Sequence, residues 1–216
     1  MEIVKKILNI FSKKLTTTKT DTPQYVDLGL PSGLKWAKCN VGAEKETDYG
    51  DYFMWGSTNP NTADECAWEH APFNGGNTSY NADAINSAKD TVCPNRILTK
   101  EYDAASQIMG GDWRMPTKDE IEELIDNTDS KWVTINGING RRFTSRIDTS
   151  KYIFIPASGD RPCSWFGGQG RICLVWSSSL DIASPNKAWD LYFSSVYVHS
   201  DNYYRRGGFA VRGVMD

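Results

Sequence analysis

Residues 117–145 have the sequence TKDEIEELIDNTDSKWVTINGINGRRFTS, in which a helix signal passes directly into a hairpin signal. Thr117 supplies an N-cap and Glu120 stands three residues later, which is the capping-box arrangement at the start of a helix. Further along, Asn136-Gly137 and Asn139-Gly140 are dipeptides typical of tight turns between antiparallel strands. This stretch therefore predicts a helix followed by a β hairpin.

The flanking segments extend the same pattern. A second helix is predicted from Thr99 to Met109, where Gly110-Gly111 ends it. Two strands flank a Pro31-Ser32-Gly33 turn near the start, and short β segments follow one another after residue 129. The predicted strands are Tyr25–Leu28, Leu34–Ala37, Trp132–Ile135, Arg142–Ser145, Tyr152–Ile155, Ile172–Ser177, Trp189–Phe193, Val196–His199 and Phe209–Val214. A parallel sheet needs helices between its later strands, so we expect an α+β fold with two helices packed on short antiparallel sheets and long irregular loops.

The chain of 216 residues is expected to form one compact domain after a short N-terminal segment. Residues 1–24 are assigned to an amphipathic helix and a Thr- and Lys-rich linker, and residues 25–216 to the domain. The helix is suited to packing on its own domain, on a second copy in a homo-oligomer or on a membrane surface, and packing against protein is preferred. Residues 59–95 lack a sustained period and predict a long surface loop.

Composition excludes several classes of partner. The net charge is −3, with 24 basic and 27 acidic residues spread along the chain, so a nucleic-acid partner is not expected. The sequence has no apolar run near the roughly 18–20 residues of a transmembrane segment. Its first 15 residues do not match a standard signal peptide, so export by that route is not predicted.

Several motifs, taken in order, resemble one known family. The opening is LPSGLKWAKCNVGA (30–43) and YGDYFMWG (49–56), the centre is WRMPT (113–117) with the helix after it, and the ending is WSSS (176–179), Ala188-Trp189 and GFAVRGV (208–214). The chain resembles a paralogous domain family common in gut Bacteroidetes and their phages. The motifs bracket most of residues 25–214.

The resemblance implies a C-type-lectin fold of the formylglycine-generating-enzyme type, with C-terminal strands and loops that present an exposed surface. It also implies a variable protein of a diversity-generating retroelement. In such systems error-prone copying at template adenines rewrites codons near the 3′ end of the gene, and the ligand-binding residues lie in the rewritten stretch. Display on a phage virion or a cell surface follows from the same resemblance.

The segment from Asp181 to Gly207 has the composition expected of such a stretch. Substitution at the adenines of an AAC-type codon reaches Asn, Ser, Asp, Tyr, His, Gly and Arg, but not Lys or Trp. The candidate ligand-binding residues are Asp181, Ser184, Asn186, Asp190, Tyr192, Ser194, Ser195, Tyr197, His199, Ser200, Asp201, Asn202, Tyr203, Tyr204 and Arg206. Large apolar residues alternate with them from 189 to 199, and a period of two predicts that the reachable residues share one face of a strand. Tyrosine with Ser, Asn and Asp is also the composition of antibody paratopes.

Catalysis and metal binding are the competing interpretations. His70 and His199 have no partner at a recognisable spacing, and Cys163 and Cys173 lack the motifs around the cysteine pair of sulfatase-modifying enzymes. The five cysteines form no CxxC pair and are expected to be isolated thiols, with a Cys163–Cys173 disulfide left open.

Calcium is the metal ion that the sequence motifs suggest most directly. Ser184-Pro185-Asn186 and Trp189-Asp190 echo the calcium motifs of sugar-binding C-type lectins, but the full oxygen set is missing. We therefore predict calcium-independent binding, with no metal and no cofactor.

The sequence predicts a protein that binds rather than catalyses, with a macromolecular ligand that is a protein or glycan on another cell or virion surface. Two alternatives stay open. One is an invariant surface or phage-structural scaffold of the same fold, and the other is a thiol-dependent enzyme.

Overall fold

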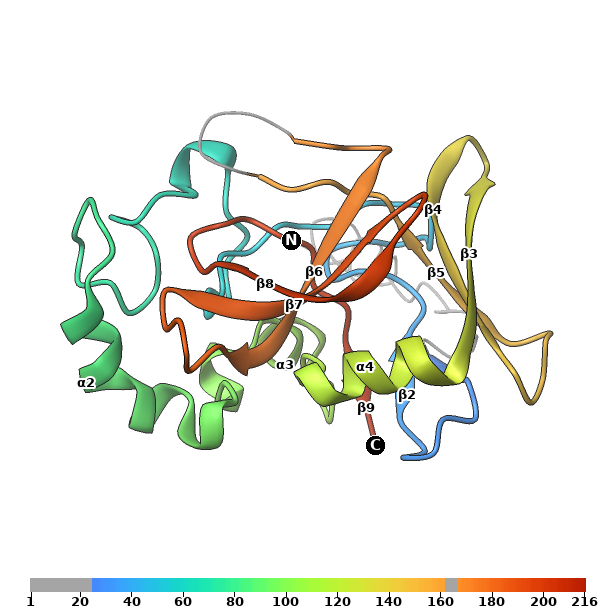
Figure 1. The fold of residues 1–216 in the computed structure, drawn as a ribbon, viewed down its shortest axis with the longest axis horizontal. Helices are drawn as coiled ribbons and strands as arrows, with labels where there is room; N and C mark the ends of the chain where they lie inside the picture. Colours follow the sequence, from blue (N-terminus) through green and yellow to red (C-terminus); the bar gives the residue numbers. More distant parts are fainter. Residues whose placement is uncertain (1–24, 162–166) are drawn as a thin grey trace, which may run out of the picture.

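The computed structural model describes residues 25–161 and 167–216, and within them the strands form three antiparallel three-stranded sheets (Figure 1). The first sheet has the order β1-β2-β9, the second β3-β4-β5 and the third β6-β7-β8. The strand bounds are β1 Tyr25–Asp27, β2 Lys35–Ala37, β3 Thr128–Ile135, β4 Ile138–Ser145, β5 Tyr152–Pro156, β6 Ile172–Leu180, β7 Lys187–Ser194, β8 Val198–Tyr204 and β9 Val214–Met215.

Three α-helices complete the described part of the chain: α2 Ala82–Val92, α3 Ala104–Met109 and α4 Lys118–Asn127. Short 3-10 turns lie at Ala63–Glu65, Pro94–Arg96 and Lys100–Tyr102. In Figure 1, α2 lies at one end of the molecule, the second sheet lies at the other end, and α4 runs along the third sheet. None of the helices in these residues is long and apolar enough to cross a membrane.

The expected α+β class is wrong, because the molecule is mostly β. Only about 19% of the described residues are helical, and α3 has just six residues. Asp103 caps α3 by accepting a hydrogen bond from the Ser106 amide, so the regular helix begins five residues later than predicted and Gly110 ends it. The strands β3 to β8, by contrast, are longer than predicted, whereas β1 and β2 are each one residue shorter. β3 and β4 pair over eight residues each, from Thr128 opposite Ser145 to Ile135 opposite Ile138. The predicted strand Phe209–Val214 is wrong, because Phe209 and Ala210 form only isolated bridges and β9 begins at Val214.

The predicted loop at residues 59–95 is also partly wrong, because it contains α2. Asn81 caps this helix through its side chain, which accepts hydrogen bonds from the amides of Asp83 and Ala84. Ile85 and Val92 are its buried residues, too few for a visible apolar period. The predicted N-terminal helix and linker lie outside the described residues.

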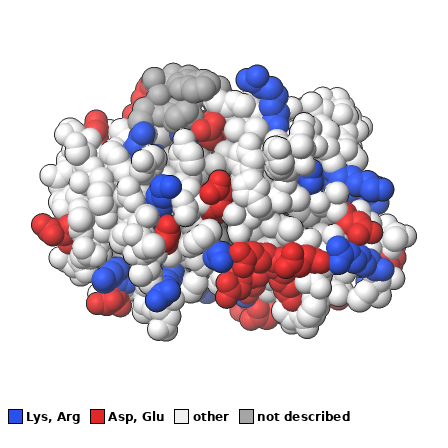
Figure 2. Space-filling view, viewed as in Figure 1, with Lys and Arg blue, Asp and Glu red and all other residues white. Residues whose placement is uncertain are grey.

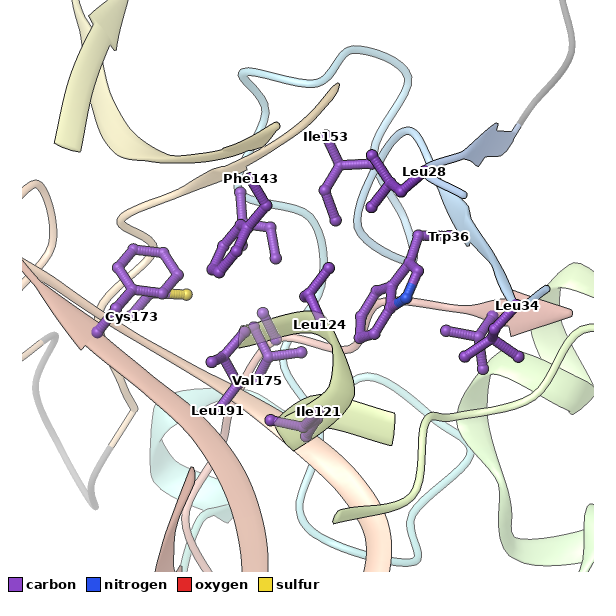
Figure 3. Close-up of a cluster of buried hydrophobic side chains, with 14 of the residues drawn as sticks. Leu28, Leu34, Trp36, Ile121, Leu124, Phe143, Ile153, Cys173, Val175 and Leu191 are labelled. Atoms are coloured by element: carbon purple, nitrogen blue, oxygen red, sulfur yellow. The ribbon is translucent and has the colours of Figure 1, made fainter. Parts of the chain in front are cut away.

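Strand β6, on the inner side of the third sheet, joins two hydrophobic clusters. Cys173 and Val175 point into a first cluster with Trp36, Leu124 and Phe143 (Figure 3), which α4 closes through Ile121 and Leu124. Leu174 and Trp176 point to the opposite side, into a second cluster with Trp55, Phe209 and Val211. Because β6 is buried on both faces, it fixes the position of the third sheet, whose edge strand is β8.

Candidate ligand-binding face

The third sheet carries most of the candidate residues, and its register decides which of them share a face. Tyr192 pairs with His199, Asp190 with Asp201 and Ala188 with Tyr203. Directly opposed residues in an antiparallel pair project from the same face of the sheet. Tyr192, His199, Asp201 and Tyr203 therefore lie together, and we call the surface that they form the outer face. The period of two predicted that the reachable residues share one face, and Asp190, Tyr192 and His199 do so, but Asp190 is completely buried.

The outer face is exposed because the second hydrophobic cluster contains residues of β6 and β7 but none of the edge strand β8. His199, Asp201 and Tyr203 alternate along β8 as exposed residues, while Val198, Ser200 and Asn202 between them are half-buried. The Tyr203 side chain is 41% exposed and rests against Phe209, with 5.3 Å between the ring centroids. The core thus holds the aromatic ring from below while part of it stays open to solvent.

Polar and aromatic groups touch one another across this face. The His199 Nε2 atom lies 3.6 Å from Asp201 Oδ2, and the His199 ring lies 5.1 Å from the Tyr192 ring. Burial is the largest cause that raises the pKa of the Tyr203 phenol, followed by the nearby Asp160 carboxylate. The phenol therefore stays protonated at neutral pH and can donate a hydrogen bond.

The turn between β7 and β8 extends the exposed surface. Ser194 shapes this turn, because its hydroxyl accepts hydrogen bonds from the amides of Val196 and Tyr197. Ser195 is exposed, and the side chains of Val196 and Tyr197 are 71% and 65% exposed. The predicted strand at Val196–His199 thus begins two residues later than expected, and its first two residues form part of the turn.

The opposite face of β8 packs toward α4. The Ser200 hydroxyl donates to Glu122 Oε1 at 2.8 Å, and Glu122 pairs with Lys118 at 3.0 Å. Lys118 in turn lies 4.5 Å from the centre of the Trp189 ring. Figure 2 shows the acidic side chains of α4 as a band beside this sheet. Ser200 is therefore a docking contact of the helix rather than part of the outer face.

Four other candidates, Asp181, Ser184, Asn186 and Asn202, hold loops in place. Asp181 is buried, and its carboxylate accepts hydrogen bonds from the amides of Ala183 and Ser184 and from the side chain of Asn202. Asn202 also accepts a hydrogen bond from Lys187. The Ser184 and Asn186 carbonyls accept from the amides of Lys187 and Arg205. The structure therefore does not bring these residues onto the outer face.

Tyr204 and Arg206 lie at the far end of β8. The Tyr204 ring lies 6.2 Å from Trp68 and 5.9 Å from Tyr203, and the Arg206 guanidinium lies 5.9 Å from the Tyr204 ring. Trp68 also lies 5.4 Å from Tyr80. The aromatic group around Tyr204 was not predicted, because residues 68 and 80 lie in the segment that we expected to be an irregular loop.

A pocket of about 730 Å³ lies next to the candidate segment, between the start of α4 and the turn after β6. Its lining includes Lys118, Leu180, Ile182 and Trp189. Ile182 is 44% exposed. The pocket borders the α4 side of the sheet, so it is separate from the outer face.

The described thiols lack the environment of a reactive nucleophile. Cys39, Cys93 and Cys173 are free thiols, and Cys66 is buried. Burial raises the pKa of the Cys173 thiol to about 11, and its sulfur lies 3.2 Å from the Ser158 hydroxyl. A reactive cysteine needs a lowered pKa and solvent access. Cys163, and with it the question of a Cys163–Cys173 disulfide, lies outside the described residues.

His70 is exposed in a turn, where its amide donates to the Ala67 carbonyl. In the described ranges we find no group of three or more His, Cys, Asp or Glu residues that could hold a metal ion.

A family model described as the Lcl C-terminal domain matches residues 30–215. The searches of curated proteins and of solved structures gave no match, so the expected C-type-lectin fold and the likeness to formylglycine-generating enzyme are not shown. Since the model covers most of the chain, the protein belongs to the Lcl C-terminal domain family.

Proposed function

We propose that this protein binds a macromolecular ligand, a protein or a glycan on another cell or virion, through the outer face and the neighbouring turn. We further propose that a diversity-generating retroelement rewrites the codons of this surface. Membership of the Lcl C-terminal domain family is compatible with such a variable ligand-binding protein.

One observation carries the proposal. The exposed residues of β8 are His199, Asp201, Tyr203 and Tyr204, and all are types that adenine substitution reaches. The buried Leu191 and Phe193 of the neighbouring strand are apolar core residues. Rewriting the exposed positions would change the surface and leave the core intact. Binding of this kind needs contact area and adaptable hydrogen bonds, which Tyr with Ser, Asn and Asp supplies.

The combined substitution of Tyr197, Tyr203 and Tyr204 by Ala tests binding. The protein is screened against a glycan array and an array of bacterial extracellular proteins, and the triple variant is then measured on every ligand found. We expect at least a tenfold loss of affinity, since tyrosine is enriched among the residues that dominate binding energy. The melting temperature should fall by only a few degrees, because all three side chains are exposed, although two of the rings lose contacts with Phe209 and Trp68.

Tyr25→Ala is the matched control, since Tyr25 is 37% exposed on β1 in the first sheet. It should leave the affinity unchanged. The proposal is contradicted if the native protein binds nothing on either array, or if the triple variant binds as well as the native protein.

A further inference from the structure

The outer face has a buried carboxylate at its base. Asp190 lies in the middle of β7 with 0% of its surface exposed, and neither carboxylate oxygen has a hydrogen-bond partner. Burying a polar group without a partner costs about 1–3 kcal/mol in proteins, and a charged group costs more. The position therefore bears a stability cost that an apolar residue would avoid.

The neighbours of Asp190 place its carboxylate beneath the exposed part of the outer face. Asp190 pairs with Trp176 of β6 on one side and with Asp201 of β8 on the other. The Cβ atoms of directly opposed residues are about 4.5–5.5 Å apart, so the two Asp side chains lie next to each other on one face. Asp201 is exposed at the edge, and Asp190 lies one strand further in.

Aromatic side chains flank the two carboxylates along the strands. The Tyr192–His199 pair lies on one side and Tyr203 on the other, each two residues away. An aromatic face attracts a positive charge, with the largest gain where the cation is removed from water. A pair of carboxylates between tyrosines is therefore suited to an organic cation.

We propose that Asp190 and Asp201 form a subsite of the outer face that takes one positively charged group, an ammonium or guanidinium, of a protein ligand. This inference rests on the proposed binding function and gives it a ligand chemistry. A guanidinium offers a planar fork of donors that carboxylates accept. Calcium fits less well, because it takes six to eight oxygen ligands and the described residues place two carboxylates here.

The surrounding charges support the same chemistry. Burial raises the pKa of Asp190 well above its ordinary value, the Asp201 carboxylate raises it further, and Lys187 opposes the shift. Lys187 does not neutralise the pair, because its ammonium donates to Asn202 on the other face. Asp160 and Arg206 lie near Tyr203, and His199 lies beside Asp201. The acidic band of α4 lies on the far side of β8 and would attract a cation toward this edge (Figure 2).

Binding of a cation should release a proton. Burial favours the protonated form of Asp190 in the free protein, whereas a positive group between the carboxylates favours the ionised form of both. The apparent affinity should therefore rise with pH. His199 lies beside Asp201, so the His199→Asn variant is needed to isolate the contribution of Asp190.

Nα-acetyl-arginine methylamide is the probe, and its neutral citrulline analogue is the matched control. Backbone amide shifts of the whole chain are followed by NMR during titration at pH 6 and pH 8. We expect saturable shifts at Asp190 and Asp201 with the arginine compound and none with citrulline. The affinity should be higher at pH 8 than at pH 6, and His199→Asn should keep that rise.

Substitutions complete the test. Asp190→Asn and Asp201→Asn should each weaken arginine binding about fivefold or more, while Asp112→Asn, an exposed Asp after α3, should leave it unchanged. Asp201 is exposed, so Asp201→Asn should fold normally. It therefore tests the subsite even if Asp190→Asn disturbs folding.

Three outcomes would overturn the subsite. They are equal shifts with arginine and citrulline, no saturable shift at either Asp, and shifts with calcium chloride but not with the arginine compound. If the arginine test is negative but the Tyr197, Tyr203 and Tyr204 triple variant still binds an array ligand more weakly than the native protein, only the proposed cation subsite is contradicted. If both the arginine test and the array test are negative, the proposed binding function is contradicted as well.

Discussion

At the scale of single residues, Asp190 makes stability depend on pH. Its pKa is raised in the folded protein by burial and by Asp201, so the folded state holds this proton more tightly than the unfolded chain does. The stabilisation from the proton is fully present below the unfolded pKa of about 4, and it is lost as pH rises toward the folded pKa. An Asn side chain at position 190 cannot ionise, so a variant with Asn there does not lose this stabilisation as pH rises.

We therefore expect Asp190→Asn to gain stability relative to the native protein as pH increases from 4 to 8. Urea unfolding at a series of pH values measures the difference. If the free energies of unfolding of the two proteins changed with pH in the same way, the pKa of Asp190 would not be raised by folding. That result would contradict the burial described above.

Arg212 is a second buried charge, and its role is structural. Its guanidinium is completely buried and donates to Asn40 Oδ1, the Ala37 carbonyl and the Phe154 carbonyl. Arg212→Ala would leave these three acceptors unsatisfied and should lower the free energy of unfolding by about 3 kcal/mol or more. Arg171→Ala, at an exposed position, should change it by no more than about 0.5 kcal/mol. Denaturant unfolding of both variants checks this, and equal effects would count against it.

At the scale of elements, local signals predicted well where side chains bond within a few residues. The capping box at Thr117 and Glu120 is present, with Thr117 Oγ1 accepting from the Glu120 amide and Glu120 Oε2 accepting from the Thr117 amide. The Asn136-Gly137 turn joins β3 and β4 as predicted, with positive φ at both residues. The second turn prediction is wrong, because Asn139-Gly140 lies inside β4 and pairs with β3.

Prediction failed where distant contacts decide. The helix α2 is stabilised through Ile85 and Val92, whose burial no local pattern reveals. Asp190 was predicted as a surface contact because its residue type fits the reachable set. Its burial depends on the neighbouring strands β6 and β8, which sequence alone does not place.

The capping box gives a prediction at this scale. Thr117→Ala removes the side-chain acceptor at the start of α4 and should cost about 1 kcal/mol of stability. Thr99→Ala is the matched control, because Thr99 precedes a 3-10 turn without a side-chain cap, and it should have little effect. Urea unfolding monitored by circular dichroism compares them, and a Thr117 variant as stable as the control would contradict the role of the cap.

At the scale of the whole molecule, the two faces of β6 connect the sheets into one scaffold. The first cluster joins it to α4 and to the first two sheets, and the second joins it to Trp55 and Phe209. In the third sheet, the exposed residues of β8 and its turn lie outside these clusters, whereas Val198 of β8 packs against the first. Such a scaffold separates the residues that hold the fold from those that can change.

The most direct test of this account is to sequence the segment that encodes Asp181–Gly207, with several kilobases of flanking DNA, from many isolates. The account predicts a near-duplicate of this segment beside a reverse-transcriptase gene. It also predicts substitutions at the adenines of outer-face and turn codons such as Tyr197, His199, Asp201 and Tyr203, with Leu191 and Phe193 unchanged. If there is no duplicate, and no excess of substitutions over the rest of the gene, the surface is an invariant one and the proposed function is contradicted.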